Sequence, residues 1–481
     1  MWVHATDPVS LDPILTSDSP STNVTSQIFE GLVRFDPSVP NIQLEPLLAE
    51  SFGQLDPYTW YFNLHSGVYF HDGAYFNAHA VTQNFSRIFN PNNNVPQIFI
   101  LDMISEVIAI DDYTVHIITE FPFAPLAGHL ANRVAFMVSP YAIAEEEAGG
   151  ILVSENAIGT GPFKFHSRSH GNYILLERFD DYWGSTALPA TVEFRVIPEP
   201  AIRLAMLEAG EAHGLEGMPT DYQIALGIPS IDVFTMETTQ IDFIGFNTMP
   251  THPYLSDIRV RQAISMAINR QQIIDYLAEG LGTLAEGPLS NMVAFAPQNA
   301  QHLPYDIEQA RTLLEEAGLA EGFTLNFWTN EGNSFREQVG VFVQSALSHL
   351  NITVNLQTQP WATYLENTDQ GLHDMYMLGW ITTTGDADYG LHPLFHSSQH
   401  GPAGNRTFFT NEALDELLDR GRVSTDSQER YEIYAQAVDI INHYAPKVFI
   451  RFVEQVIVTY NIDGLDVDFS VTPWFQNVTI R

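Results

Sequence analysis

The feature of this sequence that most restricts its fold is the alternation of strand-like and helix-like segments along nearly its whole length. Thr59–Leu64 alternates apolar and polar residues as a half-buried strand does, whereas His79–Phe89 gathers its apolar residues on one helical face. The change of period recurs later, where a predicted helix over Ser334–Leu350 precedes a predicted strand over Ile352–Gln357. This alternation predicts an α/β fold whose lobes contain mixed sheets, with a ligand cleft between the lobes.

Other segments follow the same two patterns. Strands are predicted over Tyr113–Thr119, Phe163–Phe165, Tyr173–Glu177, Val192–Ile197, Phe323–Trp328, Val448–Phe452 and Gln455–Tyr460. Helices are predicted after an N-cap at Ser21 or Thr22 and over Pro200–Glu211, Asp257–Glu279, Asp306–Ala317, Asn411–Arg422 and Gln428–Tyr444. Gly318 follows one of these helices at the position where a left-handed residue commonly ends a helix.

The length of 481 residues predicts two or three domains, because a single hydrophobic core stops growing well below that size. Hydrophobic residues make up 45% of the chain, which is typical of a globular protein. We find no uninterrupted apolar run of about 18 residues, the minimum for a membrane-spanning helix.

The chain is strongly acidic. It has 58 Asp and Glu against 20 Lys and Arg, for a formal net charge of −38, and Lys164 and Lys447 are its two lysines. Such a surface repels nucleic acid and anionic lipid. The composition favours a protein exposed to salt or to low pH outside a buffered cytoplasm, and the alternative is an acidic surface that binds a ligand.

Signatures of catalysis are missing from the sequence. There is no cysteine, so disulfides, thiolate metal sites and cysteine nucleophiles are excluded. We find no G-x-S-x-G elbow, no phosphate loop and no H-E-x-x-H motif, and Gly159-Thr160-Gly161 lacks the third glycine of a dinucleotide fingerprint. The sequence therefore predicts a protein that is not an enzyme and needs no cofactor.

Two polar clusters near the C-terminal third were considered as reactive sites. His392, His396 and His400 recur every four residues and could hold a metal on one helical face, but Pro393 makes a continuous helix doubtful. We therefore expect no metal site. Asp386 and Asp388 could form an acid–base pair, yet two carboxylates in a glycine-containing loop are more typical of a turn or a helix cap.

Seven motifs in a fixed order give the chain a resemblance to the solute-binding proteins of peptide and nickel ABC transporters, known as extracellular solute-binding protein family 5. The motifs are Ile28-Phe29-Glu30-Gly31-Leu32-Val33 with Asp36-Pro37, Pro46-Leu47-Leu48-Ala49-Glu50-Ser51, Thr59-Trp60, Gly67-Val68-Tyr69-Phe70-His71-Asp72-Gly73 with Phe76-Asn77-Ala78, Gly159-Thr160-Gly161-Pro162-Phe163, Asp181-Tyr182-Trp183-Gly184, and Asp257-Ile258-Arg259-Val260-Arg261-Gln262-Ala263 with Asn269-Arg270.

The resemblance implies a periplasmic-binding-protein-like fold with three domains. Domain I would combine residues 1–29, 158–245 and 450–481, domain II would be an insertion over 30–157, and domain III would span 246–449. By the same resemblance the ligand is enclosed between domains I and III, and closure of the hinge is what the transporter senses. Phe246 and Asn247 lie at the crossover, where a hinge, a pocket or both are implied.

The resemblance also implies a function. The chain would capture short peptides as the substrate-binding component of an ABC importer and deliver them to the permease subunits, as a monomer outside the cytoplasmic membrane. The sequence begins Met1-Trp2-Val3 without an export signal, which fits either a cytosolic protein or a removed signal, and the family favours removal. The alternatives are a nickel- or haem-chelate-binding protein of the same fold and a receptor for peptide pheromones.

The ligand residues follow from the resemblance. Trp361, in the segment that contains Tyr364, and Trp380 would face the ligand, with Trp380 as a flat wall and an N–H donor. Typical peptide binders place an aspartate three positions after this second tryptophan to pair with the peptide's α-amino group, and here that position is Thr383. A neutral hydroxyl cannot supply the same charge-assisted bond, which puts that recognition in doubt.

The segment around Thr383 resembles the glutathione-binding branch of the family. Glutathione carries two carboxylates, for which Arg406 is a candidate clamp and Arg133 a weaker one, each with a salt bridge as its alternative role. The remaining candidate ligand residues are those that align with an extended segment beside the ligand or flank Trp380, namely Ser17, Asp18, Ser19, Pro20, Ile381, Thr382, Thr384, Asp386 and Asp388.

Overall fold

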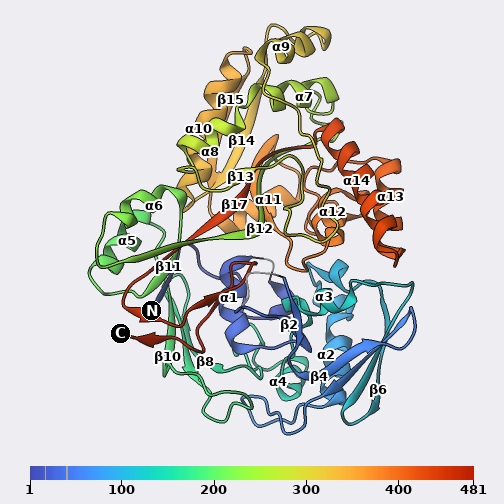
Figure 1. Ribbon diagram of the computed structural model, residues 1–481, viewed down its shortest axis with the longest axis vertical. Helices are drawn as coiled ribbons and strands as arrows, with labels where there is room; N and C mark the ends of the chain where they lie inside the picture. Colours follow the sequence, from blue (N-terminus) through green and yellow to red (C-terminus); the bar gives the residue numbers. More distant parts are fainter. Residues whose placement is uncertain (17, 39–41) are drawn as a thin grey trace. The chain divides into compact units, whose positions relative to one another are not determined.

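The computed structural model describes residues 1–16, 18–38 and 42–481. The chain forms two compact units. Unit 1 comprises Met1–Leu215, Val423–Thr425 and Thr459–Arg481, and unit 2 comprises Glu216–Arg422 and Asp426–Val458. Each unit is a mixed α/β structure (Figure 1), as the alternation of segments predicts.

Unit 1 contains a mixed sheet with the strand order β11-β1-β10-β9-β8. Its strands are β1 (Trp2–His4), β8 (Phe163–Ser169), β9 (Tyr173–Arg178), β10 (Thr191–Val196) and β11 (Gly214–Gly217). β1 runs parallel to both β10 and β11, whereas β9 is antiparallel to both of its neighbours, β8 and β10. The first strand of the chain therefore lies between two other strands, and its residues are buried.

A second, antiparallel sheet of unit 1 has the order β4-β5-β7-β6. It consists of β4 (Ala49–Gln54), β5 (Thr59–Leu64), β6 (Ile104–Asp111) and β7 (Thr114–Thr119). Every second residue of β5 is buried, which confirms the strand that the alternation of its sequence predicts. Helix α2 (Ala78–Ile88) packs against β6 and β7 and covers one face of this sheet.

Unit 2 is built on a sheet with the order β15-β14-β16-β12-β17. The strands are β12 (Asp232–Phe246), β14 (Thr324–Asn330), β15 (Thr353–Gln359), β16 (Met375–Ile381) and β17 (Lys447–Thr459). Along β12, Ile244 and Phe246 belong to one hydrophobic core, whereas Ile241 and Phe243 belong to another. Because successive side chains of a strand point to opposite faces, both faces of this sheet are buried.

Two groups of helices cover those faces (Figure 1). The core with Phe246 includes residues of α7 (Ile258–Ala267), α8 (Arg270–Tyr276), α9 (Ile307–Glu316) and α10 (Ser334–Ser348). The core with Phe243 includes residues of α11 (Trp361–Asp369), α12 (Ala387–Phe395), α13 (Glu412–Val423) and α14 (Ser427–Tyr444).

The remaining elements are short. The helices are α1 (Ser19–Ile28), α3 (Leu126–Leu130), α4 (Pro140–Glu147), α5 (Pro200–Glu208) and α6 (Pro219–Leu226), with 3-10 turns at Pro13–Leu15, Pro91–Asn93, Ile98–Ile100, Arg133–Ala135 and Ser397–Gln399. The strands are β2 (Val33–Phe35), β3 (Leu44–Pro46), β13 (Thr283–Leu284), β18 (Ile462–Asp463), β19 (Asp466–Val467), β20 (Pro473–Trp474) and β21 (Thr479–Ile480). Within the described ranges, no helix has the length and apolar character needed to cross a membrane.

Three predicted boundaries are wrong. The helix expected over Asp257–Glu279 is divided into α7 and α8, because the side chain of Asn269 accepts a hydrogen bond from the backbone of Gln272 and starts a new helix. The two strands expected at the C-terminus form one strand, β17. The first helix begins after Asp18, whose carboxylate accepts from the Ser21 backbone, rather than at Ser21 or Thr22.

The predicted three-domain division stays a prediction. The boundaries between the compact units fall at 215/216 and 458/459, whereas the predicted boundaries of domain III are at 245/246 and 449/450. The difference arises because β12 and β17 pack on the helices of unit 2 along most of their length. The four-stranded sheet of unit 1 lies wholly within the predicted domain II.

Glu30 joins three of the sequence motifs inside unit 1. Its carboxylate accepts hydrogen bonds from Tyr182 (2.6 Å), Trp183 (2.9 Å) and Thr160 (2.8 Å). Burial raises the pKa of Glu30, and the three donors act in the opposite direction. The backbone at Gly159 packs closely against the backbone of Ile28. The Cβ of any other residue at this position would lie 2.1 Å from the carbonyl oxygen of Ile28. Residues of three sequence motifs therefore contact one another inside unit 1.

Candidate functional site

The candidate ligand segment of unit 2 begins at the end of β16. Trp380 pairs with Ile241 of β12 and Ile381 pairs with Gln240, after which the chain leaves the sheet. Trp380, Ile381 and Thr383 are partly exposed, whereas the strand before them is buried. The fold therefore presents these three predicted ligand residues together at a strand end, where loops of α/β sheets commonly bind ligands.

The two other threonines of this segment are buried and hydrogen-bonded. The Thr382 carbonyl accepts from the Thr239 hydroxyl at 3.3 Å, and the Thr384 hydroxyl accepts from the backbone N–H of Asp386 at 3.4 Å. Gly385 has a φ of +67°, in the left-handed region that glycine adopts without strain. Thr382 and Thr384 thus shape the turn that presents Thr383.

The indole of Trp380 has a structural partner that the sequence did not reveal. Its N–H donates to the carbonyl oxygen of Tyr389 at 3.1 Å, and the rings of the two residues lie 5.2 Å apart. Pro393, four residues after Tyr389, lies inside α12 and has no N–H for that carbonyl. Trp380 therefore supplies the missing donor, so its ring face, and not its N–H, is what remains for a ligand.

Asp386 and Asp388 are engaged in ion pairs inside unit 2. Asp386 accepts from both terminal nitrogens of Arg430, at 2.9 and 2.7 Å, and caps α12 through the backbone N–H of Asp388. Asp388 lies 3.4 Å from the Nε of Arg422. Burial raises the pKa of Asp388 to about 6, against the opposing effect of Arg422. These contacts are the cap that the sequence favoured over an acid–base pair.

Trp361 and Tyr364 lie on α11, with their rings 6.1 Å apart. Tyr364 is fully buried and donates its hydroxyl hydrogen to the carbonyl of Met377 at 2.6 Å. Trp361 is partly exposed, and the guanidinium of Arg336 lies 6.0 Å from its ring centre. Sequence reasoning missed Arg336, because its position on α10 gives no sign of its distance from Trp361 in space.

Arg406 already has a carboxylate partner. Its Nε lies 2.7 Å from Oδ1 of Asp369, and both side chains are largely buried. Burial raises the pKa of Asp369, and the positive charge of Arg406 opposes that rise. The salt bridge that the sequence analysis weighed against a ligand clamp is therefore present.

Phe246 and Asn247, predicted at the domain crossover, are completely buried in unit 2. Phe246 belongs to a hydrophobic core, and the Asn247 amide donates to the carbonyls of Gly371 (2.9 Å) and His373 (3.1 Å). The side chains of both residues are therefore engaged in contacts inside unit 2.

Asp18, Ser19 and Pro20 form the start of α1 in unit 1, and Ser17 lies outside the described residues. Asp18 is 5% exposed, and its Oδ2 accepts from the backbone N–H of Ser21 at 3.2 Å. Its Oδ1 has no hydrogen-bond partner among the described residues. Burial raises the pKa of Asp18. Ser19 and Pro20 are partly exposed.

Arg133 is buried in unit 1 on a 3-10 turn. Its Nε donates to the hydroxyl of Thr16 at 3.1 Å, and a terminal nitrogen donates to the side-chain oxygen of Gln97 at 2.8 Å. The positive charge of Arg133 opposes the rise that burial causes in the pKa of Asp18. These contacts tie Arg133 to the segment that precedes α1.

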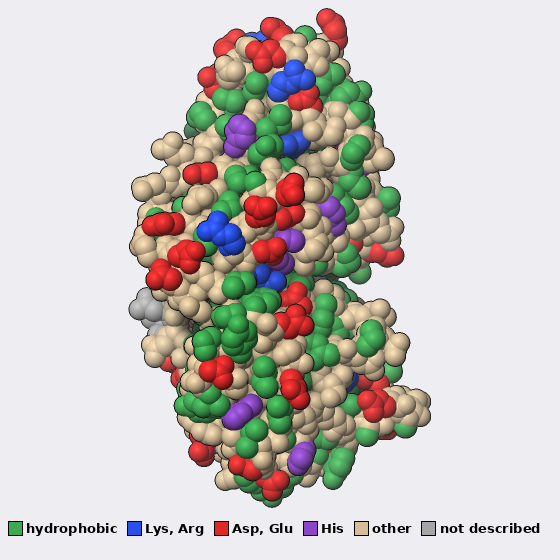
Figure 2. All heavy atoms as spheres, turned by 90° about the vertical axis from the view of Figure 1, so that its right-hand side faces the viewer, with side chains coloured by type: hydrophobic (Ala, Val, Ile, Leu, Met, Phe, Trp, Pro, Cys, Tyr) green, Lys and Arg blue, Asp and Glu red, His purple; other side chains and the backbone are tan. Residues whose placement is uncertain are grey.

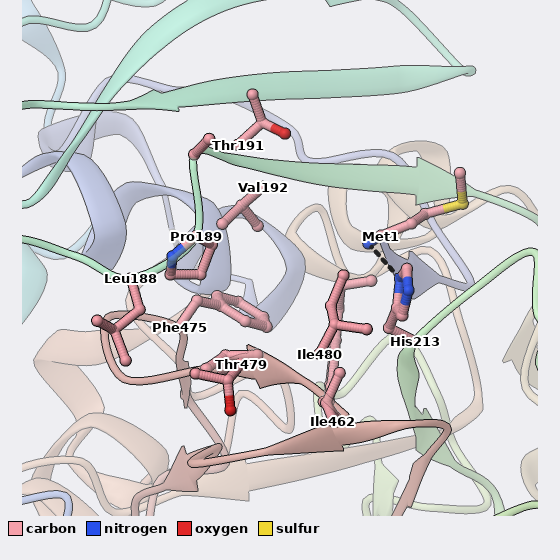
Figure 3. Close-up of a pocket in the computed structure, with 13 residues that line it drawn as sticks. Met1, Leu188, Pro189, Thr191, Val192, His213, Ile462, Phe475, Thr479 and Ile480 are labelled. Carbon is pink, nitrogen blue, oxygen red and sulfur yellow. Dashed lines mark hydrogen bonds between the residues drawn. The ribbon is translucent and has the colours of Figure 1, made fainter.

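A cavity of about 550 Å³ lies in unit 1 (Figure 3). Apolar side chains such as Val192, Phe475 and Ile480 line it, and the N-terminal ammonium lies 3.0 Å from Nδ1 of His213 at its edge. No predicted ligand residue belongs to its walls. Its described lining residues include no Asp, Glu, Lys or Arg side chain.

Comparisons with known proteins match nearly the whole chain. Glutathione-binding protein GsiB of Pectobacterium atrosepticum is 32% identical over 461 residues, which cover 92% of this chain and 86% of the relative. Glutathione-binding protein GsiB of Salmonella typhi is 30% identical over 448 residues, covering 91% and 85%.

Among solved structures, the periplasmic binding protein DppA from Helicobacter pylori, in complex with the peptide STSA, has a TM-score of 0.93 and 27% identity, covering 100% of this chain and 97% of that one. A dipeptide-binding protein from Pseudoalteromonas sp. SM9913 has a TM-score of 0.94 at 22% identity, covering 100% and 99%, which shows the shared fold. A family model for the middle region of these proteins matches residues 43–402. The chain belongs to the bacterial extracellular solute-binding proteins, family 5.

Proposed function

We propose that this protein is the substrate-binding component of an ABC importer that captures short peptides, with glutathione or a similar γ-linked peptide as its preferred ligand. The observation that carries the proposal is the similarity to glutathione-binding proteins at 30–32% identity over more than nine-tenths of the chain. The peptide complex of the similar DppA structure supports a peptide as the general class of ligand. The proposal also has the protein act outside the cytoplasmic membrane, as a monomer, and pass its ligand to permease subunits.

In unit 2 we assign ligand contact to Trp380, Ile381 and Thr383. Their exposure at the end of β16 supports this assignment. The Trp380 ring offers a flat apolar surface, and its orientation is fixed by the bond to Tyr389. A rigid ring limits the entropy lost when a flexible peptide binds. Trp361 is a second, weaker candidate because Arg336 lies over its ring.

In unit 1 we assign ligand contact to Asp18, Ser19 and Pro20. A buried carboxylate oxygen without a partner among the described residues is costly, and a ligand ammonium would satisfy Oδ1 of Asp18. This contact would replace the aspartate that typical relatives carry where this chain has Thr383. Arg406 and Arg133 remain candidate carboxylate ligands, but each would have to share its guanidinium with the partners described above.

The proposal is tested by isothermal titration with reduced glutathione, oxidised glutathione, γ-glutamylcysteine, a pool of di- to pentapeptides, and Ni²⁺ with and without histidine. We expect reduced glutathione or γ-glutamylcysteine to bind with the highest affinity and to be recovered uncut. Binding of ordinary α-peptides alone would retain the importer role and reject the γ-peptide preference. Binding of the nickel–histidine mixture alone would reject both.

Two variants of one residue separate the ring of Trp380 from its N–H. Trp380→Ala removes the surface on which the ligand packs, so we expect its affinity to fall by about tenfold or more. Trp380→Phe keeps a ring and loses only the bond to Tyr389, so its affinity should stay within about threefold of wild type while its melting temperature falls. Equal affinities for wild type and Trp380→Ala would exclude Trp380 from the site.

A further inference from the structure

Two histidines and one aspartate of unit 2 bring their ligand atoms together on the neighbouring helices α12 and α13. His392 lies in α12, His396 immediately follows it, and Asp419 lies on α13. The Nε2 atom of His396 lies 3.4 Å from Oδ1 of Asp419, and that of His392 lies 3.9 Å from the same oxygen. Among the described residues these three form a group whose donor atoms all lie within 4.8 Å of one another.

The helical spacing that the sequence made doubtful is present. Pro393 lies inside α12, yet the backbone N–H of His396 donates to the carbonyl of His392 at 3.0 Å, which continues the helical pattern to His396. The bond from Trp380 to Tyr389 offsets the N–H that Pro393 lacks. Residues four apart on a helix share a face, and the two imidazole rings are accordingly stacked 4.5 Å apart. The reason for expecting no metal at these histidines is therefore removed.

The environment of His396 favours a cation. Its Nε2 is buried and has no hydrogen-bond partner among the residues described, while its Nδ1 lies 2.7 Å from the hydroxyl of Ser398. Nδ1 also accepts a hydrogen bond from the backbone N–H of Ser398 at 3.1 Å, so in the cation-free protein the proton of the neutral ring lies on Nε2 and faces Asp419. A cation at Nε2 would take the place of that proton, which would move to Nδ1 and be donated to the Ser398 hydroxyl. Histidines that bind metals commonly donate their other ring N–H in this way, which fixes the tautomer. A second carboxylate, Asp415, lies 4.0 Å from the same Nε2.

We propose that His392, His396 and Asp419 form a binding site for Zn²⁺ or a related transition-metal cation, on the protein's own side chains and separate from the proposed peptide ligand. Two imidazole nitrogens and one carboxylate match the ligands of Zn²⁺, whereas Mg²⁺ and Ca²⁺ prefer oxygen alone. Ligands of tetrahedral zinc lie roughly 3.3 Å apart. The 3.4 Å between Nε2 of His396 and Oδ1 of Asp419 already fits this distance. The side chain of Asp419 is 64% exposed, so it can move to shorten the 3.9 Å between its Oδ1 and Nε2 of His392.

The site would connect α12 to α13. Helix α12 begins directly after the segment from Trp380 to Thr384, so a bound cation would fix the helix that follows the proposed ligand segment. The face of the molecule on the side of α13 and α14, drawn in Figure 2, has histidine and acidic side chains next to one another. One position of a tetrahedral ion would remain for water.

The experiment is a titration of chelator-treated, tag-free protein with Zn²⁺, with Mg²⁺ and Ca²⁺ as controls for weak binding to the acidic surface. We expect one Zn²⁺ per chain, and a rise in melting temperature that Mg²⁺ and Ca²⁺ do not produce. His396→Gln and Asp419→Asn should each weaken Zn²⁺ binding by about tenfold or more. Ser398→Ala should weaken it by about tenfold, because it removes the acceptor of the Nδ1 proton.

His400→Gln is the matched control, since His400 continues the four-residue spacing but lies outside the group. It should bind Zn²⁺ as wild type does. Co²⁺ in place of Zn²⁺ should give visible absorption that is present in His400→Gln and lost in His396→Gln. Asp419 is exposed, so Asp419→Asn will fold even if a histidine variant does not. Wild-type affinity in Asp419→Asn and His396→Gln, or no stoichiometric binding by wild type, would overturn the proposal.

Discussion

At the scale of single residues, Lys447 is a buried amine in an apolar environment. Its side chain is completely buried at the start of β17, and its Nζ has no hydrogen-bond partner in the described part of the chain. The amine lies 4.2 Å from the ring centre of Phe243 and 4.7 Å from that of Phe395. Burial lowers the pKa of Lys447 well below its ordinary value, with the nearby charge of Arg406 acting in the same direction.

We expect Lys447→Met to raise the free energy of unfolding by about 1–3 kcal/mol at pH 7, the cost of an unsatisfied buried polar group. The pKa of Lys447 is lower in the folded state than in the unfolded state, where it is about 10.4. The free energy of unfolding of the wild type therefore decreases as pH falls from about 10.4 to the folded-state pKa. The advantage of the variant should therefore shrink between pH 7 and pH 10, as measured by urea unfolding.

Lys164→Met is the control, because Lys164 is half-exposed and pairs with Glu177 at the surface, at 3.0 Å. Its effect should stay below about 1 kcal/mol at both pH values. If Lys447→Met were less stable than wild type at pH 7, the amine would be a net stabilising cation against the two rings.

At the scale of elements, the start of α12 depends on a residue of α14. Asp386 caps α12 and accepts two hydrogen bonds from Arg430, whose side chain is 4% exposed and which also donates from Nε to the carbonyl of Gly421 on α13. Three helices therefore meet at one guanidinium. A buried pair of this kind is weak as a net source of stability but costly to break on one side.

Asp386→Asn keeps a side-chain oxygen for the cap and removes the negative charge facing Arg430. We expect the free energy of unfolding to fall by about 3 kcal/mol, because Arg430 is left as a buried charge without its carboxylate. The exposed pair Arg420 and Glu429, 3.8 Å apart, is the control, and Arg420→Gln should cost less than about 1 kcal/mol.

Peptide titrations of the same variant decide its role in binding. An unchanged ligand affinity in folded Asp386→Asn means that this carboxylate only supports the segment after Trp380. A large loss of affinity with little loss of stability would return Asp386 to the ligand contacts that the sequence predicted.

At the scale of the whole molecule, negative charge dominates. The formal net charge is −38, and Figure 2 shows acidic side chains over all of the face it displays, with few basic ones between them. Repulsion among these charges destabilises the compact state, and salt weakens it once the screening length falls to about 8 Å near 0.15 M.

We expect the melting temperature at pH 8 to rise by several degrees between 20 and 200 mM NaCl, with little further rise above that range. The rise reflects screening, so Na₂SO₄ at equal ionic strength should produce the same shift within this range. A larger effect of sulfate would indicate exclusion of the salt from the surface, and no rise with either salt would contradict the role given to repulsion. Differential scanning fluorimetry gives the measurement.

Periodicity in the sequence predicted local structure well where one face of an element is buried. The alternation in Thr59–Leu64 predicts β5, and the spacing in Asp306–Ala317 with Gly318 predicts α9 and its end, where Gly318 has a φ of +74°. The same signal failed where a short polar group overrides the pattern, as Asn269 does between α7 and α8. Ordered motifs predicted the family, since each motif is a local feature of the chain.

The sequence by itself therefore determined the α/β class and the family, because these depend on residue types at short spacing. The tertiary structure alone decided what the polar side chains do. Glu30 receives its hydrogen bonds from residues 130 to 153 positions away, and Arg430 reaches Asp386 from 44 positions away. Partners so distant leave no periodic pattern in the sequence. In a buried environment, however, they decide whether a carboxylate, an indole or an imidazole has its hydrogen-bond partner within the fold or can bond to a ligand.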